Sequence, residues 1–110
     1  MARKKQVSQS AHGDVEKLAK ERVSKGAAFL DTAHAGWAGK IRLNDLNLCR
    51  DDTCPLGQLY GWFSDGLNAL GIGVEQKIDL GFWPMHDGYG LGCEPFYRAA
   101  WRREVVKRVP

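Results

Sequence analysis

The decapeptide CPLGQLYGWF, residues 54–63, joins apolar, aromatic and glycine residues in one run. Proline is favoured in the first turn of a helix. Pro55 therefore predicts a helix that begins here, with Thr53 or Cys54 as its cap. Leucines and aromatic residues continue one apolar face at spacings of three and four. We expect a helix over 55–70 that belongs to the core or to an interface.

Two glycines lie inside this predicted helix. Gly57 and Gly61 stand four residues apart, on one side of it. Each glycine costs a helix about 1 kcal/mol relative to alanine. The pair therefore predicts that another backbone approaches this side closely. Gly71 and Gly73 are expected to end the element.

Toward the N-terminus, the sequence predicts a long helix. Apolar residues recur from Val15 to Leu30 at spacings of three and four, which is typical of one helix face. We expect a helix over 13–32 that stops near Gly36, because glycine accepts the positive φ of a helix end. A single helical turn is then predicted over 37–41.

Toward the C-terminus, the pattern is weaker. Ile78, Leu80 and Phe82 alternate with polar or small residues, which predicts a weak strand. Residues 85–92 carry three glycines and are expected to form a structured loop. Pro95 then predicts a final helix, with the proline at its first position.

These elements predict a mainly α fold. We expect a small helical domain over 13–110, with three principal helices around one core. We also expect a structured glycine-rich loop in this domain, and the pattern leaves a short β segment open. Residues 1–12 are expected to be a flexible basic arm. The chain has 110 residues, of which 44% are hydrophobic, and this suffices for one domain.

Charge is distributed unevenly along the chain. The formal net charge is +3, but residues 1–25 hold seven Lys and Arg against three Asp and Glu. Residues 94–110 hold five against two, so basic ends flank an acidic middle. This asymmetry suggests a polyanion or an acidic protein as partner. Solvated helix faces are the simpler interpretation.

The sequence predicts a cytoplasmic protein that does not enter a membrane. No apolar run follows the basic N-terminus as it would in a secretory signal, and none approaches the roughly 20 residues that span a bilayer. Three cysteines are an odd number, which argues against a disulfide framework. We expect reduced thiols in a cytosolic compartment.

The candidate metal ligands are Cys49, Cys54, His86 and Cys93. Their spacings are C-x4-C and H-x6-C, whereas zinc sites favour tighter pairs. Buried cysteines are the simpler interpretation, since the free thiol is among the most buried groups. We predict no metal and no cofactor. The spacing leaves open whether the four residues come together.

A cysteine nucleophile is the candidate for catalysis. Cys54 at a helix N-terminus would have a lowered thiol pKa. A nucleophile also needs a base and an orienting group, and His34, His86, Asp51 and Asp52 are the candidates. No recognisable motif surrounds them, so we predict that the protein is not an enzyme.

The tryptophans point to a binding function. Four tryptophans exceed what a core of this size is expected to hide, and Trp, Tyr and Arg dominate binding hot spots. We expect a non-enzymatic protein that binds another protein, and self-association through the same apolar surface stays open. The predicted partner-binding residues are Trp62, Trp83, Trp101, Arg102 and Arg98.

The alternative function is a small DNA- or RNA-binding regulator. It would use the basic C-terminal helix and the N-terminal arm, because phosphate binding needs clustered positive charge. Nucleic-acid-binding domains are usually more basic overall than this chain. The residues predicted for this alternative are Arg3, Lys4, Lys5, Arg103, Lys107 and Arg108.

Several blocks carry a resemblance to a known group. They are GAAFLD at 26–31, GWA at 36–38 with Ile41, LNL at 46–48 and CPLGQLYG at 54–61. The chain resembles small proteins encoded by phages of actinobacteria and by prophages of their hosts, and Cys-x-Leu-Gly-Gln-Leu-x-Gly is the most specific block. The likeness covers the middle half of the chain. It implies expression in the cytoplasm of a bacterial host and binding to a host or phage macromolecule, with no established activity.

Overall fold

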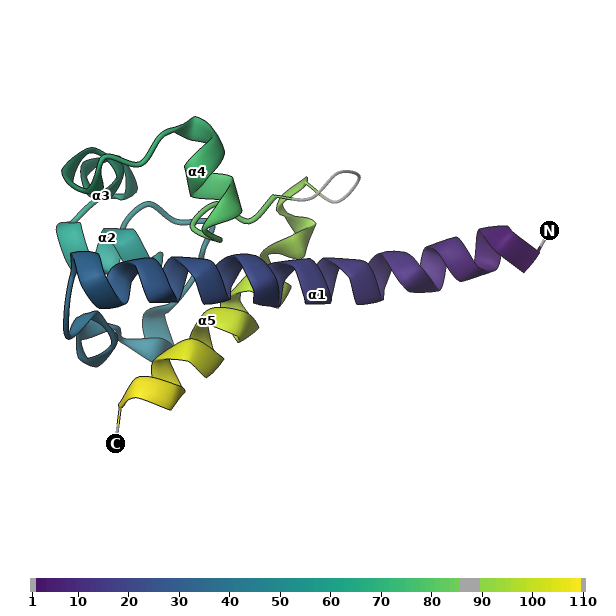
Figure 1. Cartoon of the computed structure of the whole chain (residues 1–110), viewed down its shortest axis with the longest axis horizontal. Helices are drawn as coiled ribbons and strands as arrows, with labels where there is room; N and C mark the ends of the chain where they lie inside the picture. The colour runs from purple at the N-terminus through teal and green to yellow at the C-terminus, as the bar shows by residue number, and fades with distance from the viewer. Residues whose placement is uncertain (1, 86–89, 110) are drawn as a thin grey trace.

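The structure is a computed structural model that describes residues 2–85 and 90–109, with side chains for 13–85 and 92–109. Within these residues the fold is helical and contains no strand, so the mainly α prediction is confirmed (Figure 1). The α-helices are α1 (Ala2–Ala33), α2 (Pro55–Tyr60), α3 (Phe63–Leu70), α4 (Val74–Asp79) and α5 (Glu94–Arg108). Short 3₁₀ helices are η1 (Trp37–Lys40), η2 (Leu43–Asp45) and η3 (Gly90–Cys93).

The helix α1 is longer than predicted. It begins at Ala2 and ends at Ala33, and its N-terminal part runs past the other helices (Figure 1). Residues 2–12 contain no proline or glycine, so nothing in their backbone stops the helix. The expected arm therefore carries helical backbone, while its flexibility stays a prediction. The predicted stop is confirmed, because Gly36 takes a φ of 80°.

The predicted central helix is in fact two helices. The chain breaks at Gly61, which has a φ of 97°, and Trp62 follows in an extended conformation. Positive φ carries no steric penalty for glycine, so Gly61 allows the chain to turn here. It does not allow another backbone to approach closely, because no described atom beyond its chain neighbours lies within 4 Å of a Cβ added at Gly61. Close approach does occur at Gly57, where an added Cβ would overlap the carbonyl of Asp51.

The predicted strand around residues 78–82 is wrong. Residues Val74–Asp79 form α4, and the side-chain oxygen of Gln76 accepts a hydrogen bond from the backbone N–H of Gly73 at 3.0 Å. This is the capping interaction that favours a helix start. After the helix, Gly81 turns the chain with a φ of 75°. The apparent alternation thus spans a helix end and a turn.

In the C-terminal part, the predicted final helix is present. Within the predicted loop over 85–92, residues 86–89 lie outside the described residues, and Gly90–Cys93 form η3. The helix α5 begins at Glu94, so Pro95 lies in its first turn, one residue after the predicted first position. With five α-helices in the described residues, the prediction of three principal helices is too few.

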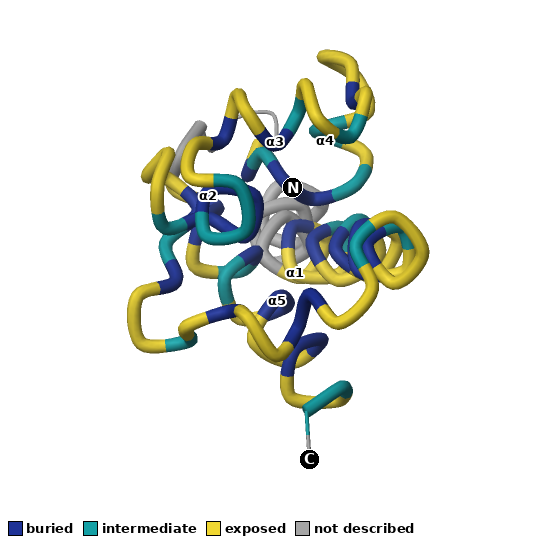
Figure 2. The backbone as a smooth tube through the Cα atoms, turned by 90° about the vertical axis from the view of Figure 1, so that its left-hand side faces the viewer, coloured by how far each residue is buried: buried dark blue, intermediate teal, exposed yellow. Residues whose placement is uncertain are grey.

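The core lies between α1 and α5, with the central segments packed around them. Figure 2 shows buried stretches along the inner sides of these helices and exposed stretches outside. Trp101 of α5 is at its centre, edge-on to Trp37 at 5.6 Å and stacked on Phe82 at 5.3 Å between ring centroids. Its indole N–H donates to the carbonyl of Gly81 at 2.8 Å. The buried face of α1 is Val15, Ala19, Val23, Ala27 and Leu30.

The described helices do not include a membrane span. None of them is both long enough and apolar enough to cross a bilayer.

Candidate interaction surface

Two of the four tryptophans lie in the core. Trp101 is 0% exposed and Trp37 is similarly buried, while Trp83 is half-buried. Only Trp62, at 56% exposure, offers most of its indole to solvent. The expectation that the core does not hide all four tryptophans is confirmed for Trp62 and in part for Trp83. Edge-to-face and stacked packing, however, buries Trp37 and Trp101 completely. Trp101 cannot contact a partner in this fold.

Trp83 is held by its neighbours. Its ring stacks on Phe63 with 5.6 Å between centroids, and the ammonium of Lys77 lies 5.0 Å from the ring centroid. A cation over an indole face contributes roughly 0.5–1 kcal/mol at exposed sites. Trp83 therefore has an intramolecular role that the sequence does not predict. Of the four tryptophans, Trp62 offers the most exposed surface to a partner.

Arg98 neutralises a buried carboxylate. Its guanidinium binds Glu94 through two nitrogens, with the Nη2–Oε1 distance at 2.6 Å and the Nε–Oε2 distance at 3.1 Å. The Glu94 side chain is 5% exposed and also accepts from the backbone N–H of Leu48 at 2.8 Å. A buried charge needs such pairing. Arg98 thus supports the fold at the start of α5.

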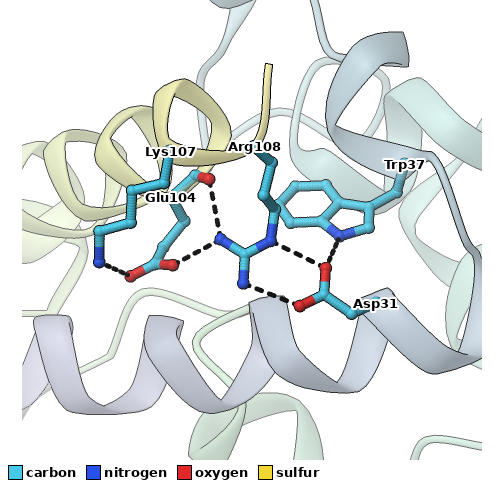
Figure 3. A network of polar contacts seen from close by, with 5 residues as sticks. All are labelled: Asp31, Trp37, Glu104, Lys107 and Arg108. Carbon is cyan, nitrogen blue, oxygen red and sulfur yellow. Dashed lines mark hydrogen bonds and ion pairs between the residues drawn. The ribbon is translucent and has the colours of Figure 1, made fainter. Parts of the chain in front are cut away.

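Arg108 is tied into a network at the end of α5 (Figure 3). It donates to both carboxylate oxygens of Asp31, at 2.8 and 2.9 Å, and to Glu104 at 2.7 Å. Trp37 donates to the same Asp31 at 2.9 Å and lies under the guanidinium, 5.5 Å from ring centroid to Cζ. Lys107 donates to Glu104 at 3.1 Å. Arg108 is therefore engaged within the fold and is a poor candidate for phosphate contact.

The network lowers the pKa of Asp31 to about 2, from the ordinary 3.8. The hydrogen bond from Arg108 is the main cause, and the one from Trp37 is next. Because the folded pKa is the lower one, the stabilisation is complete above about pH 4 and is lost as pH falls through about 2. Asp31 is about half-exposed, so solvent screening limits the contribution to about 1 kcal/mol.

Asp31→Asn is expected to lose about 1 kcal/mol of unfolding free energy at pH 7. The amide oxygen can still accept from Trp37, so the variant removes mainly the charge that faces Arg108. Urea denaturation between pH 2 and pH 7 measures this, and the variant should show a flatter loss of stability below pH 4. Asp45→Asn, in the exposed pair with Arg42, should change little. An unchanged pH dependence in Asp31→Asn would contradict the assignment.

A hollow of about 540 Å³ lies between α1 and α5. Lys20 and Lys25 line it from α1, and Arg103 and Lys107 line it from α5. Two carboxylates, Glu21 and Glu104, also contribute. Burial alone would raise the pKa of Glu104, but hydrogen bonds from Arg108 and Lys107 outweigh it and lower the pKa. Glu104 is therefore ionised and already paired.

A second hollow of about 450 Å³ adjoins the first on α5 and shares Arg103 and Lys107 with it. Its apolar part includes Val106, which is 59% exposed. Arg102 lines it too and donates to the carbonyl of Leu43 at 3.0 Å, which orients its guanidinium. We refer to the two hollows together as the α5 face, defined by Lys20, Lys25, Ala99, Arg102, Arg103, Val106 and Lys107.

The sequence identifies only part of this surface. Arg102, Arg103 and Lys107 are predicted site residues, whereas Lys20, Lys25 and Val106 are not. A signal for Val106 is present, since an aliphatic residue interrupts the basic side of the last helix. The side chains of Arg3, Lys4 and Lys5 lie outside the described residues.

The candidate nucleophile Cys54 is a buried cap residue in the structure. Of the two residues predicted to cap α2, Cys54 is the cap. Its sulfur accepts a hydrogen bond from the backbone N–H of Gly57 at 3.3 Å. Burial raises the pKa of this thiol to about 11, which is the reverse of the expected lowering. Cys49 is exposed and Cys93 is buried, and His86 lies outside the described residues. Among the described side chains, no three of His, Cys, Asp and Glu could hold a metal ion together.

His34, the other candidate base, joins two helix ends. Its Nδ1 lies 2.8 Å from the hydroxyl of Tyr60, and its Nε2 lies 3.4 Å from the ammonium of Lys40. The imidazole and phenol rings meet edge-to-face. Both ring nitrogens thus have partners that connect the end of α1 with η1 and α2.

Comparison of the chain with protein-family models, with curated proteins and with solved structures finds no match.

Proposed function

We propose that the protein is a non-enzymatic binding protein whose α5 face docks an acidic segment of a host or phage protein. The observation that carries this proposal is that an exposed apolar patch is continuous with cations from two helices. An apolar centre with a polar rim is the usual anatomy of a protein interface. The phage-type context comes from the sequence resemblance alone.

The charge of the α5 face suits an acidic partner. Five of its seven residues are cations, and the carboxylates beside them are those of Glu21 and Glu104. Glu104 is paired with Arg108 and with Lys107, and Lys20 lies 3.7 Å from Glu16. Among the described residues, the cations of the face outside these ion pairs are Lys25, Arg102 and Arg103. The surface is thus left with a positive excess, which attracts an acidic segment and repels basic ones.

The apolar part favours a protein over a nucleic acid. Ala99 and Val106 stand seven residues apart on α5, which places them on the same side of the helix, and both are exposed. Burying a valine side chain completely contributes about 1.5–3 kcal/mol. An apolar side chain of a partner can cover this patch, whereas a phosphate backbone cannot.

The aromatic residues expected to bind the partner lie elsewhere. Trp62 precedes α3, and α3 and α4 lie on one side of α1 while α5 lies on the other (Figures 1 and 2). The predicted aromatic and arginine surface is therefore two surfaces. We assign the acidic partner to the α5 face and keep Trp62 as a separate contact residue.

The proposal is tested with two fluorescent probes: a peptide with leucines seven residues apart flanked by glutamates, and a duplex oligonucleotide. We expect the peptide to bind, and Arg102→Glu with Arg103→Glu to weaken it by at least about tenfold, or 1.4 kcal/mol. Val106→Ser, which leaves the charge unchanged, should weaken it about threefold to tenfold. Arg50→Glu, at an exposed site outside the α5 face, is the matched control and should bind normally.

A nucleic acid is the alternative ligand, and the cations of the α1/α5 hollow favour it. In that case the oligonucleotide would bind more tightly than the peptide, with a steep dependence of affinity on salt. Val106→Ser would then have no effect. Those results together would contradict the protein-binding proposal.

A further inference from the structure

The side of the molecule opposite the α5 face carries the most exposed tryptophan and an excess of carboxylates. Trp62 precedes α3 and is 56% exposed. Residues 51–79 hold five Asp and Glu against one Lys. Figures 1 and 2 place α3 and α4 on one side of α1 and α5 on the other. The protein therefore presents an acidic, aromatic surface and a basic, apolar surface on opposite sides.

The backbone places two aspartates beside Trp62. The N–H of Phe63 donates to the carbonyl of Asp51 at 2.8 Å, which holds Asp51 against the residue after Trp62. Asp65 lies in the first turn of α3, three residues after Trp62. Both aspartates are exposed, and the ion pairs between described side chains include neither of them. We refer to Asp51, Trp62 and Asp65 as the Trp62 face.

The one cation of this region is already engaged by aromatic rings. The ammonium of Lys77 lies 5.8 Å from the ring centroid of Phe63 and 5.0 Å from that of Trp83. A cation over an aromatic ring is a favourable contact, and tryptophan is the best ring for it. Trp62 has an exposed indole with carboxylates beside it, so its surface suits a partner that brings cations and an apolar group together.

We propose that the α5 face docks the Trp62 face of a second copy of the same chain, so that copies associate head to tail. The inference rests on the proposed function, because it assigns a second occupant to the α5 face. Opposite charges on the two faces steer and orient the encounter. Tryptophan and arginine are also the residues that carry most of the energy at interface centres.

The two faces are matched in chemistry. The apolar hollow of about 450 Å³ has room for an indole, since pockets of about 300–1,000 Å³ accommodate whole drug-sized ligands. Trp62 of one copy covers Val106 of the next. The aspartates of the Trp62 face then meet cations of the α5 face, of which Lys25, Arg102 and Arg103 lie outside its internal ion pairs.

This contact has consequences for assembly and for regulation. It joins two different surfaces that lie on opposite sides of the molecule, so each added copy leaves one surface free and the assembly stays open. Self-association also occupies the α5 face. An acidic partner therefore competes with the second copy, and binding of that partner dissociates the assembly.

Sedimentation velocity under reducing conditions measures the self-association of the full chain without added ligand. We expect the average mass to rise between about 10 µM and about 1 mM protein, as for a small transient interface. It should return to the monomer mass at about 0.5 M salt, which screens exposed charges. Lys17→Glu is the matched control, because Lys17 is exposed on α1 but lines neither hollow, and it should associate like the wild type.

Two variants each block one face. Arg102→Glu with Arg103→Glu blocks the α5 face, and Trp62→Ala with Asp65→Lys blocks the Trp62 face; all four residues are exposed. Each variant alone should stay monomeric. An equimolar mixture should form a dimer and nothing larger, because one intact face of each kind remains. Circular dichroism first checks the fold, and Asp51→Lys replaces Asp65→Lys if the latter disturbs α3.

A wild-type protein that is monomeric at about 1 mM, where even weak interfaces associate, would overturn the inference. So would a variant that associates alone, or a mixture that does not dimerise. The acidic peptide separates this failure from that of the proposed function, since the variant blocked at the Trp62 face keeps its α5 face and should bind the peptide normally. Peptide binding without self-association removes only the inference, and self-association without peptide binding removes only the proposed function.

Discussion

Gly26→Ala is expected to reduce the unfolding free energy by about 2–3 kcal/mol, although alanine is the better helix former. Gly26 lies inside α1, where alanine would normally gain about 1 kcal/mol. An added Cβ would, however, overlap the backbone carbonyl of Leu80 and lie 3.1 Å from the indole of Trp101. A carbonyl that belongs to the turn after α4 cannot move aside as a side chain can. Overpacking of this kind typically costs 1–3 kcal/mol, occasionally more.

Gly13→Ala in the same helix is the matched control. No atom outside the local helix lies within 4 Å of a Cβ added there, so the substitution should stabilise the protein by up to about 1 kcal/mol. Urea denaturation followed by circular dichroism compares the two variants. Equal stabilisation by both substitutions would show that the end of α4 does not contact α1 at Gly26.

Trp101→Ala is expected to cost about 4 kcal/mol, the range for a large aromatic residue in a core. The indole is fully buried and packs against both Trp37 and Phe82. Its removal would leave a cavity and an unsatisfied carbonyl at Gly81, to which its N–H donates. A domain is stable by only about 5–15 kcal/mol, so the variant should be marginally folded.

Trp62→Ala should change the unfolding free energy by no more than about 0.5 kcal/mol, since surface substitutions of this kind have small effects. Its indole is 56% exposed. Circular dichroism is the suitable signal, because both variants alter tryptophan fluorescence. If Trp101→Ala were as stable as Trp62→Ala, Trp101 would not lie in the core. Trp101 would then again be a candidate for binding a partner, as the sequence predicts.

These expectations also show which parts of the candidate site can be predicted from a sequence. Arg102, Arg103 and Lys107 stand out because basic residues are concentrated at the C-terminal end. Arg98 and Arg108 belong to the same cluster, yet Glu94, Asp31 and Glu104 engage them within the fold. Asp31 is far from Arg108 in the chain, so spacing alone cannot separate a solvent-exposed arginine from a paired one.

Local features that depend on a few neighbouring residues are correctly predicted. The apolar face of α1, the positive φ at Gly36 and the start of α2 at Pro55 behave as the pattern indicates. The reason is that helix faces, caps and glycine turns are decided by interactions within about one helical turn. The break at Gly61 is also local, but a glycine within an apolar pattern is compatible with both a helix and a turn.

Which apolar side chains are covered depends on contacts between distant segments. Periodicity shows that Trp101 and Val106 both belong to α5, but packing against α1 and the turn at Gly81 buries the first and leaves the second exposed. The α5 face likewise exists because Lys20 and Arg103 line one hollow between two helices that lie at opposite ends of the chain. Burial and the pairing of charges are properties of surfaces in contact, and these surfaces come together when the helices pack.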